Sequence, residues 1–88
     1  MEQDPIVNNL PKLQWACRRG MLELDVLLGN FLKEAYPSLS LEDKKIFVEL
    51  LSCADTDLFD WLLGYASPTD ERLARITEAI RQHARDRI

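Results

Sequence analysis

Arg19, Gly20, Glu23 and Asp25 lie within seven residues of one another, where the first two predicted helices meet. An arginine guanidinium is a planar fork that matches carboxylates and phosphates, and a glycine lets another backbone approach closely. An arginine and a glutamate side by side recognise a charged target and reject a wrong one. Met21 adds a flexible, adaptable side chain that suits an interface. The chemistry available to this cluster is therefore recognition of a partner surface.

A purely structural explanation accounts for the same charges. Gly20 accepts the positive φ of a helix stop, and Arg18 and Arg19 suit the negative end of the first helix dipole. If Gly20 is also the N-cap of the next helix, Glu23 is its third residue and forms half of a capping box. Asp25 then lies near the positive end of that helix. From these residues alone, both explanations remain open.

More of the chain resembles the succinate dehydrogenase assembly factors, the SdhE family of small helical proteins. The family's Arg-Gly-x-x-Glu motif falls on Arg19, Gly20 and Glu23, and the resemblance runs from about Leu13 to about Arg81. Several motifs in the right order are more specific than any one alone. The other matching segments are Trp15-Ala16-Cys17-Arg18, Met21, Leu24-Asp25, Tyr36-Pro37-Ser38-Leu39-Ser40 and Asp57-Leu58-Phe59-Asp60-Trp61-Leu62.

The resemblance implies an assembly chaperone that promotes covalent attachment of FAD to the flavoprotein subunit of succinate dehydrogenase. The implied bond joins a histidine of that subunit to the 8α carbon of FAD, and the fumarate reductase flavoprotein is an open second target. The chain then acts in trans, is no enzyme, and needs no cofactor of its own, because FAD belongs to the partner. The family's functional glycine and glutamate correspond to Gly20 and Glu23. The expected partner-binding residues are Trp15, Arg18, Arg19, Gly20, Met21, Glu23 and Asp25.

The residues themselves indicate no catalytic, cofactor or metal site. His83 is the one histidine, expected on the exposed side of the last helix, and a Cys17–His83 dyad is only arithmetically conceivable. There is no P-loop and no G-x-G-x-x-G to cradle a pyrophosphate. Cys17 and Cys53 are too far apart for a CxxC pair, so we expect reduced core thiols.

The distribution of charge along the chain bears on which kind of partner it binds. The net charge is −4, but residues 20–71 carry eleven acidic and three basic side chains. An acidic body opposes binding to nucleic acid, the alternative that would use Arg18, Arg19 and the C-terminal arginines. It suits a protein partner with a basic rim. An antitoxin-like regulatory interaction module is the other alternative that stays open.

The elements that must position the cluster are helical. Periodicity and cap residues predict a single all-α domain, a bundle of about five short helices spanning residues 9–88, preceded by a mobile N-terminal tail at residues 1–8. Expected starts are Pro11, Met21, Ser40 as a cap, Asp55 or Thr56 as a cap, and Ser67 as a cap before Pro68. Expected stops are near Arg18, Ala35, Cys53, Gly64 and the C-terminus.

Apolar spacing also predicts what these helices bury. The second helix should bury the stripe through Leu24, Leu28 and Phe31. We expect Trp15 to support the corner from half-buried beneath it, and Phe59 and Trp61 to lie in the core. No apolar run reaches the roughly 18 residues of a membrane span, and residues 1–5 lack a signal-peptide layout. We expect a monomer in the bacterial cytoplasm, with weak homodimerisation through the fourth helix left open.

Overall fold

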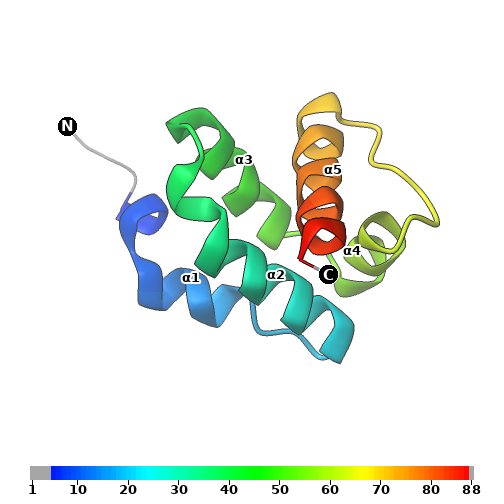
Figure 1. The fold of residues 1–88 in the computed structure, drawn as a ribbon, viewed down its shortest axis with the longest axis horizontal. Coiled ribbons are helices and arrows are strands. Elements are labelled where there is room, and N and C mark those ends of the chain that lie inside the picture. Colours follow the sequence, from blue (N-terminus) through cyan, green and yellow to red (C-terminus); the bar gives the residue numbers. More distant parts are fainter. Residues whose placement is uncertain (1–4, 88) are drawn as a thin grey trace.

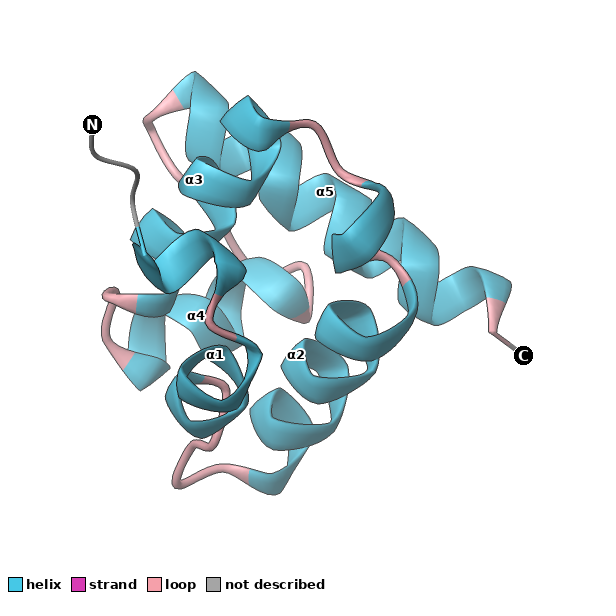
Figure 2. Cartoon of the chain, turned by 90° about the vertical axis from the view of Figure 1, so that its left-hand side faces the viewer, coloured by secondary structure: helices cyan, strands magenta, loops and turns pink. Residues whose placement is uncertain are grey.

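The fold of the computed structural model, which describes residues 5–87, is all-α, as the periodicity predicted (Figure 1). No strand occurs among the described residues, and helices make up most of the chain (Figure 2). The elements are η1 (Pro5–Asn8), α1 (Leu10–Ala16), α2 (Leu22–Glu34), η2 (Tyr36–Ser38), α3 (Leu41–Leu51), α4 (Asp55–Leu62) and α5 (Glu71–Asp86), where η marks a 3-10 helix.

Two helices begin at or next to the predicted residues. The Asn9 side chain accepts a hydrogen bond from the Lys12 N–H at 3.2 Å, and α1 follows with Pro11 in its first turn. The Ser40 hydroxyl accepts from the Asp43 N–H at 3.1 Å and opens α3. Each bond satisfies an amide that has no partner inside the helix.

Two other starts differ from the prediction. Asp70, not Ser67, caps α5, because its carboxylate accepts from the Arg72 N–H at 2.8 Å and from the Leu73 N–H at 3.5 Å. The bond from the Arg72 amide is the main cause that lowers the pKa of Asp70. Asp55 lies inside the first turn of α4, after Ala54, because its carboxylate is used elsewhere.

The predicted mobile tail is wrong for residues 5–8. These residues form η1, and the Val7 side chain is buried. The Tyr36 hydroxyl donates a hydrogen bond to the Val7 carbonyl at 2.7 Å, which ties this segment to η2. A burial contact and a hydrogen bond at long sequence separation leave no local pattern, so periodicity and cap residues cannot predict them. Residues 1–4 lie outside the described part of the chain.

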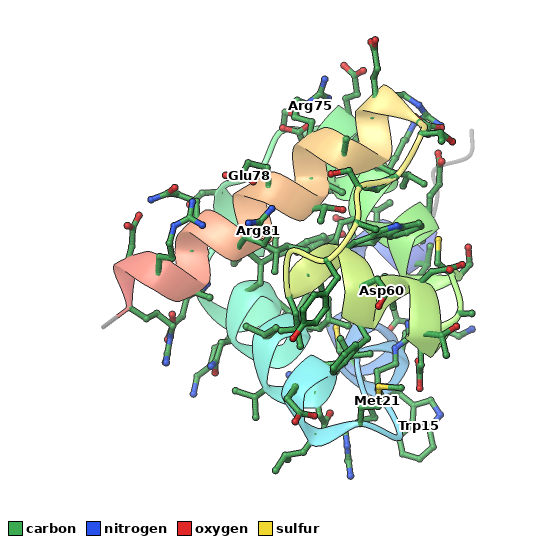
Figure 3. All side chains as sticks on the ribbon, turned by 90° about the vertical axis from the view of Figure 1, so that its right-hand side faces the viewer. Trp15, Met21, Asp60, Arg75, Glu78 and Arg81 are labelled. Atoms are coloured by element: carbon green, nitrogen blue, oxygen red, sulfur yellow. The ribbon has the colours of Figure 1, made fainter. Side chains whose placement is uncertain are left out.

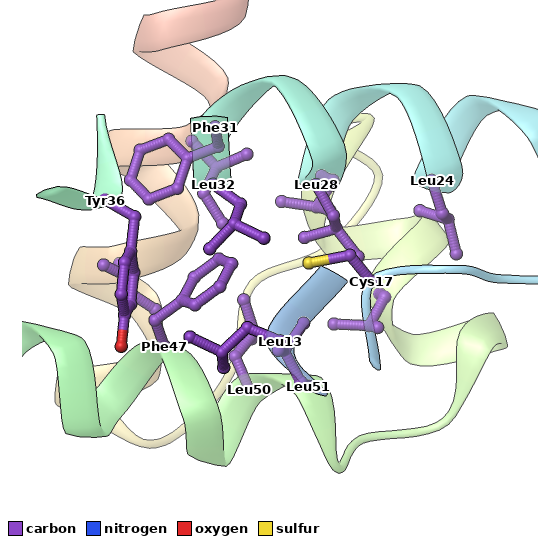
Figure 4. Close-up of a cluster of buried hydrophobic side chains, with 14 of the residues drawn as sticks. Leu13, Cys17, Leu24, Leu28, Phe31, Leu32, Tyr36, Phe47, Leu50 and Leu51 are labelled. Atoms are coloured by element: carbon purple, nitrogen blue, oxygen red, sulfur yellow. The ribbon is translucent and has the colours of Figure 1, made fainter. Parts of the chain in front are cut away.

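The core runs between the inner faces of all five α-helices (Figure 4). The stripe of α2 is confirmed, since Leu24, Leu28 and Phe31 are buried. The Phe31 and Phe47 ring centroids lie 5.5 Å apart, and the Tyr36 and Phe47 centroids 5.4 Å apart. Each fully buried leucine or phenylalanine contributes roughly 1.5–3 kcal/mol by leaving water. Packing of this kind holds α1 and α4, which are too short to be stable alone.

The fourth helix divides its crowded apolar residues between the core and the surface. Leu58 and Leu62 are buried, whereas Phe59 and Trp61 are only partly buried against the core. Gly64 has a φ of +88° and ends the helix, as predicted, because glycine adopts this conformation without steric strain. No helix within residues 5–87 is both long and apolar enough to cross a membrane.

Candidate functional site

Residues 17–21 form the connection between α1 and α2, and with the first turn of α2 they make an exposed corner. We call residues 17–25, together with the neighbouring Trp15 of α1, the corner. It lies at the end of the molecule where α4 begins, and Figure 3 shows Trp15 and Met21 together there. The structure thus brings the predicted partner-binding residues to one place. Their side chains, however, face in two directions.

Arg19 faces inward. Its side chain is only 13% exposed and forms an ion pair with the Asp55 carboxylate, with Nη1 to Oδ1 at 3.2 Å. Its Nη2 donates a hydrogen bond to the Leu51 carbonyl at the end of α3. The Arg19 Nε is buried and has no partner within the described residues. The guanidinium therefore joins the corner to the α3–α4 connection and is not presented to a partner.

Asp55 also holds the backbone of the corner. Its second oxygen, Oδ2, accepts a hydrogen bond from the Gly20 N–H at 3.3 Å. One carboxylate thus accepts from both the side chain of Arg19 and the main chain of the next residue. Because charge-assisted hydrogen bonds are stronger than neutral ones, Asp55 is the residue that fixes the corner against α4.

The predicted capping box is wrong. Met21 is the N-cap of α2, with no side-chain cap bond, so Glu23 is the second residue of the helix and not the third. The Gly20 N–H, which Glu23 was expected to reach, is bonded to Asp55 instead. The structural explanation of Glu23 as a capping residue is thereby removed.

The predicted positive φ at Gly20 is also wrong. Gly64 is the one glycine with positive φ within the described chain. A Cβ added at Gly20 would lie 3.8 Å from the nearest atom, Asp55 Oδ2, which is ordinary contact. Neither backbone conformation nor internal space requires a glycine at this position. What its hydrogen side chain does provide is a flat, exposed stretch of backbone that a partner can approach.

Glu23 faces outward. It is exposed and forms no hydrogen bond or ion pair with any described residue. Its neighbour Asp25 is half-buried and lies 3.7 Å from the Arg18 Nε, measured from Oδ1. The corner therefore presents one unpaired carboxylate beside a loose, solvent-exposed ion pair.

Trp15 is not the half-buried support that we expected. Its side chain is 76% exposed. Leu13 and Cys17, which lie two residues to either side, are both buried, and residues two apart on a helix point to opposite faces. Met21, by contrast, is partly buried against the core. The surface of the corner thus combines a large aromatic ring with a carboxylate.

Two grooves flank the corner. The larger, of about 530 Å³, lies between α1 and α2, and Arg18, Asp25 and Lys33 are its charged lining residues. The smaller, of about 390 Å³, lies between α2 and α4 and is lined by Leu22, Glu23, Val26, Leu27 and Leu63. Val26 contributes to both. Neither groove can be predicted from the sequence, because both depend on how the helices cross.

Among residues 5–87, the two cysteines and the one histidine have separate surroundings. Both cysteines are free, as predicted, and burial raises the pKa of the Cys17 thiol to about 11, so this thiol stays protonated near neutral pH. His83 is largely buried, contrary to expectation; its Nε2 lies 2.9 Å from Glu34 Oε1, and its ring packs edge-on against Phe31. No group of three potential metal ligands occurs among the described residues.

The arginines of α5 are paired with acidic side chains. Arg81 and Arg85 both lie near Glu78, at 3.4 and 3.2 Å, and Arg87 pairs with Glu34 at 2.7 Å. Together with the inward-facing Arg19, this pairing leaves little unbalanced positive charge for a phosphate backbone. It weighs against the nucleic-acid alternative.

The sequence does not identify Asp55 as the residue that holds the corner. It predicts Asp55 as a candidate helix cap, since Asp is favoured there. The one available signal was indirect: an arginine beside a predicted helix junction needs an acceptor if it turns inward. With eleven acidic residues between positions 20 and 71, the sequence does not identify which one accepts.

The family model and the sequence relatives agree on one family. The family model described as "Flavinator of succinate dehydrogenase" matches residues 11–84. The FAD assembly factor SdhE of Photorhabdus laumondii is 47% identical over 81 residues, which cover 92% of each chain. That of Shewanella oneidensis is 47% identical over 76 residues, covering 86% of this chain and 93% of the relative. The solution structure of a UPF0350 protein superposes with a TM-score of 0.75 at 35% identity, covering 98% of this chain and 89% of the other.

Proposed function

Because the chain belongs to the family of flavinators of succinate dehydrogenase, we propose that it binds the flavoprotein subunit of that enzyme and promotes covalent attachment of FAD to a histidine of the subunit. The subunit supplies both the histidine and the FAD-binding fold. This chain contributes a binding surface and no reacting group. It is an assembly factor and not an enzyme, and it carries no cofactor of its own.

The observation that carries this proposal is the unpaired, exposed carboxylate of Glu23 on a rigid corner. Glu23 has no partner among the described residues and no capping role, so its place near the positive end of the α2 dipole is its one structural contribution. Its position is nevertheless well defined, because Asp55 holds the preceding loop through Arg19 and the Gly20 amide. An unpaired charge on an anchored backbone suits recognition of a charged group on a partner.

The other exposed residues of the corner have complementary roles in the proposal. Gly20 allows the subunit's backbone to come close, and Trp15 offers the large apolar contact typical of interface anchors. Met21, Arg18 and Asp25 complete the surface around them. By holding the immature subunit in one conformation, the chain aligns FAD with the histidine, so that it acts by positioning and preorganised electrostatics in trans.

We also propose a second target protein, an oligomeric state and a cellular location. The fumarate reductase flavoprotein is a second target. The chain acts as a monomer in the bacterial cytoplasm, where the flavoprotein subunit is assembled. These statements rest on the family resemblance and on the acidic surface, which suits a partner with a basic rim.

The test is expression of the flavoprotein subunit with and without this chain, followed by denaturing electrophoresis and detection of flavin fluorescence in the subunit band. Fluorescence that survives denaturation reports covalently bound flavin. We expect it to rise when this chain is present. Equal fluorescence with and without the chain, at equal amounts of subunit, would contradict the proposed function.

A further inference from the structure

The smaller groove, between α2 and α4, extends the corner toward residues outside the Arg-Gly-x-x-Glu motif. We call Leu22, Glu23, Val26, Leu27 and Leu63 the α2–α4 groove. Its walls are apolar except for Glu23, and three of its aliphatic side chains are exposed; Leu22 is 72% exposed. Exposed aliphatic residues gathered around a concave surface are typical of a site that binds another protein.

The charges around this groove are negative. Glu23 lies in its wall, Asp60 lies one turn before Leu63 on α4, and Asp57 lies one turn before Asp60. None of the three forms an ion pair with a described residue. Figure 3 shows Asp60 directed outward on the same side as Met21. The nearby cation, Arg81, packs over Gly64 and pairs with Glu78 at 3.4 Å, so it does not neutralise these carboxylates.

We propose that the α2–α4 groove takes an apolar side chain of the flavoprotein subunit next to a lysine or arginine that pairs with Glu23. This inference rests on the proposed function and names the chemistry that the subunit must present. An apolar side chain fills the aliphatic groove and displaces water from it. With water displaced, the pairing of Glu23 with a cation strengthens, because the local dielectric falls. Leu22 and Leu63 are then residues that determine specificity.

A second copy of this chain is a poor occupant of the groove. In a two-fold symmetric dimer the same patch meets itself. Such an interface would place Glu23 and Asp60 of one copy near the same carboxylates of the other, and like charges across an interface are unfavourable. A partner with basic side chains, by contrast, would be attracted by the same carboxylates that repel a second copy.

The experiment measures binding of purified flavoprotein subunit to the full chain, by calorimetry or biolayer interferometry. The test variant is Leu22→Ser combined with Leu63→Ser, and the control is Leu41→Ser. Leu41 is 60% exposed at the first residue of α3 and lines neither groove. We expect the double variant to bind about tenfold more weakly or worse, as for loss of an interface anchor, and Leu41→Ser to bind like the unsubstituted chain. Circular dichroism checks that each variant is folded.

A second arm tests the cation. Glu23→Gln keeps the shape of the side chain but removes its charge, so we expect weaker binding at low salt and a smaller dependence of affinity on salt concentration. Subunit binding that is unchanged in the double variant would overturn the inference while leaving the proposed function intact. Unchanged salt dependence in Glu23→Gln would overturn the cation pairing. Failure of the unsubstituted chain to bind would contradict the proposed function and this inference together.

The same variants show whether the α2–α4 groove binds the subunit or a second copy of this chain. Sedimentation equilibrium measures self-association of the unsubstituted chain and of the double variant. We expect both to be monomers at the concentrations used for binding. A dimer that is lost in the double variant would assign the groove to a second copy and overturn the inference.

Discussion

The two faces of the corner differ in what holds their charges. On the inner face, Arg19 is almost buried and has Asp55 and the Leu51 carbonyl as partners. On the outer face, Glu23 is exposed and has none among the described residues. The two residues are four apart in one motif, so sequence proximity suggests one shared role. The structure instead separates a residue that positions the corner from a residue that the corner presents.

Gly20 lies between the two faces, and substitution there should have the largest effect. We expect Gly20→Arg to abolish flavinylation, because a long side chain would cover the exposed backbone of the corner. The free energy of unfolding should change by no more than about 1 kcal/mol, since the site is exposed. Urea denaturation and flavin fluorescence of the subunit measure the two effects.

Gly20→Ala is the matched control, because a Cβ at this position meets nothing closer than 3.8 Å. It should fold as well as the unsubstituted chain and keep more activity than Gly20→Arg. If Gly20→Arg proved unfolded by circular dichroism, the glycine would have a structural role and the division between the faces would fail at this residue.

Substitutions on the inner face should act through stability. We expect Arg19→Ala and Asp55→Ala each to lower the free energy of unfolding by about 1–3 kcal/mol, because each leaves a mostly buried polar partner unsatisfied. Their effects should be less than additive in the double variant, since the two side chains share one interaction. Arg72→Ala is the control: its ion pair with Glu49 is exposed, so its loss should change the free energy of unfolding far less than loss of the Arg19–Asp55 pair.

Full stability of Arg19→Ala together with lost subunit binding would show that Arg19 contacts the partner directly. In that case the inward orientation of its side chain would not describe its role.

A smaller effect is expected from the cluster that joins the ends of α2 and α5, far from the corner. A hydrogen bond from Arg87 is the main cause that lowers the pKa of Glu34 to about 2, from an ordinary value near 4.5. A lowered pKa in the folded state means that the contribution to stability is complete above pH 4.5 and is lost as the pH falls toward 2. Arg87→Ala should therefore be less stable than the unsubstituted chain at neutral pH.

The measurement is the free energy of unfolding of both proteins between pH 7 and pH 2. The difference between them should shrink as the pH falls through this window, because protonated Glu34 no longer gains from Arg87. Because the cluster lies far from the corner, we expect no change in flavinylation. A difference that stays constant with pH would show that Arg87 acts through packing alone.

Local patterns in the sequence predicted most of the fold. The five helices and the buried stripe of α2 follow from apolar periodicity, which depends on residues three and four apart. The cap of α5 was misplaced by three residues, because Ser67 and Asp70 are both good caps and the path of the loop selects between them. The tail was misjudged because the hydrogen bond that ties Val7 to the rest of the molecule comes from Tyr36, which lies on another element.

The clustering of the candidate site residues at one helix junction was predicted, but the directions of their side chains were not. Trp15 could have been placed outward, since Leu13 and Cys17 mark the opposite face of α1 as buried. The inward turn of Arg19 could not, because its acceptor Asp55 is 36 residues away. The roles of the site residues remain proposals, and the pairing of Arg19 with Asp55 is what makes them separable by mutation.

The most direct test compares Glu23→Ala with Glu42→Ala for flavinylation of the subunit. Both glutamates are exposed second residues of their helices, α2 and α3, so each contributes a similar helix-dipole term of about 0.3–1 kcal/mol. Only Glu23 lies at the corner. We predict that Glu23→Ala loses most of the covalent flavin fluorescence while Glu42→Ala retains it, with similar free energies of unfolding. Equal fluorescence for the two variants would contradict the claim that the outer face of the corner carries the function.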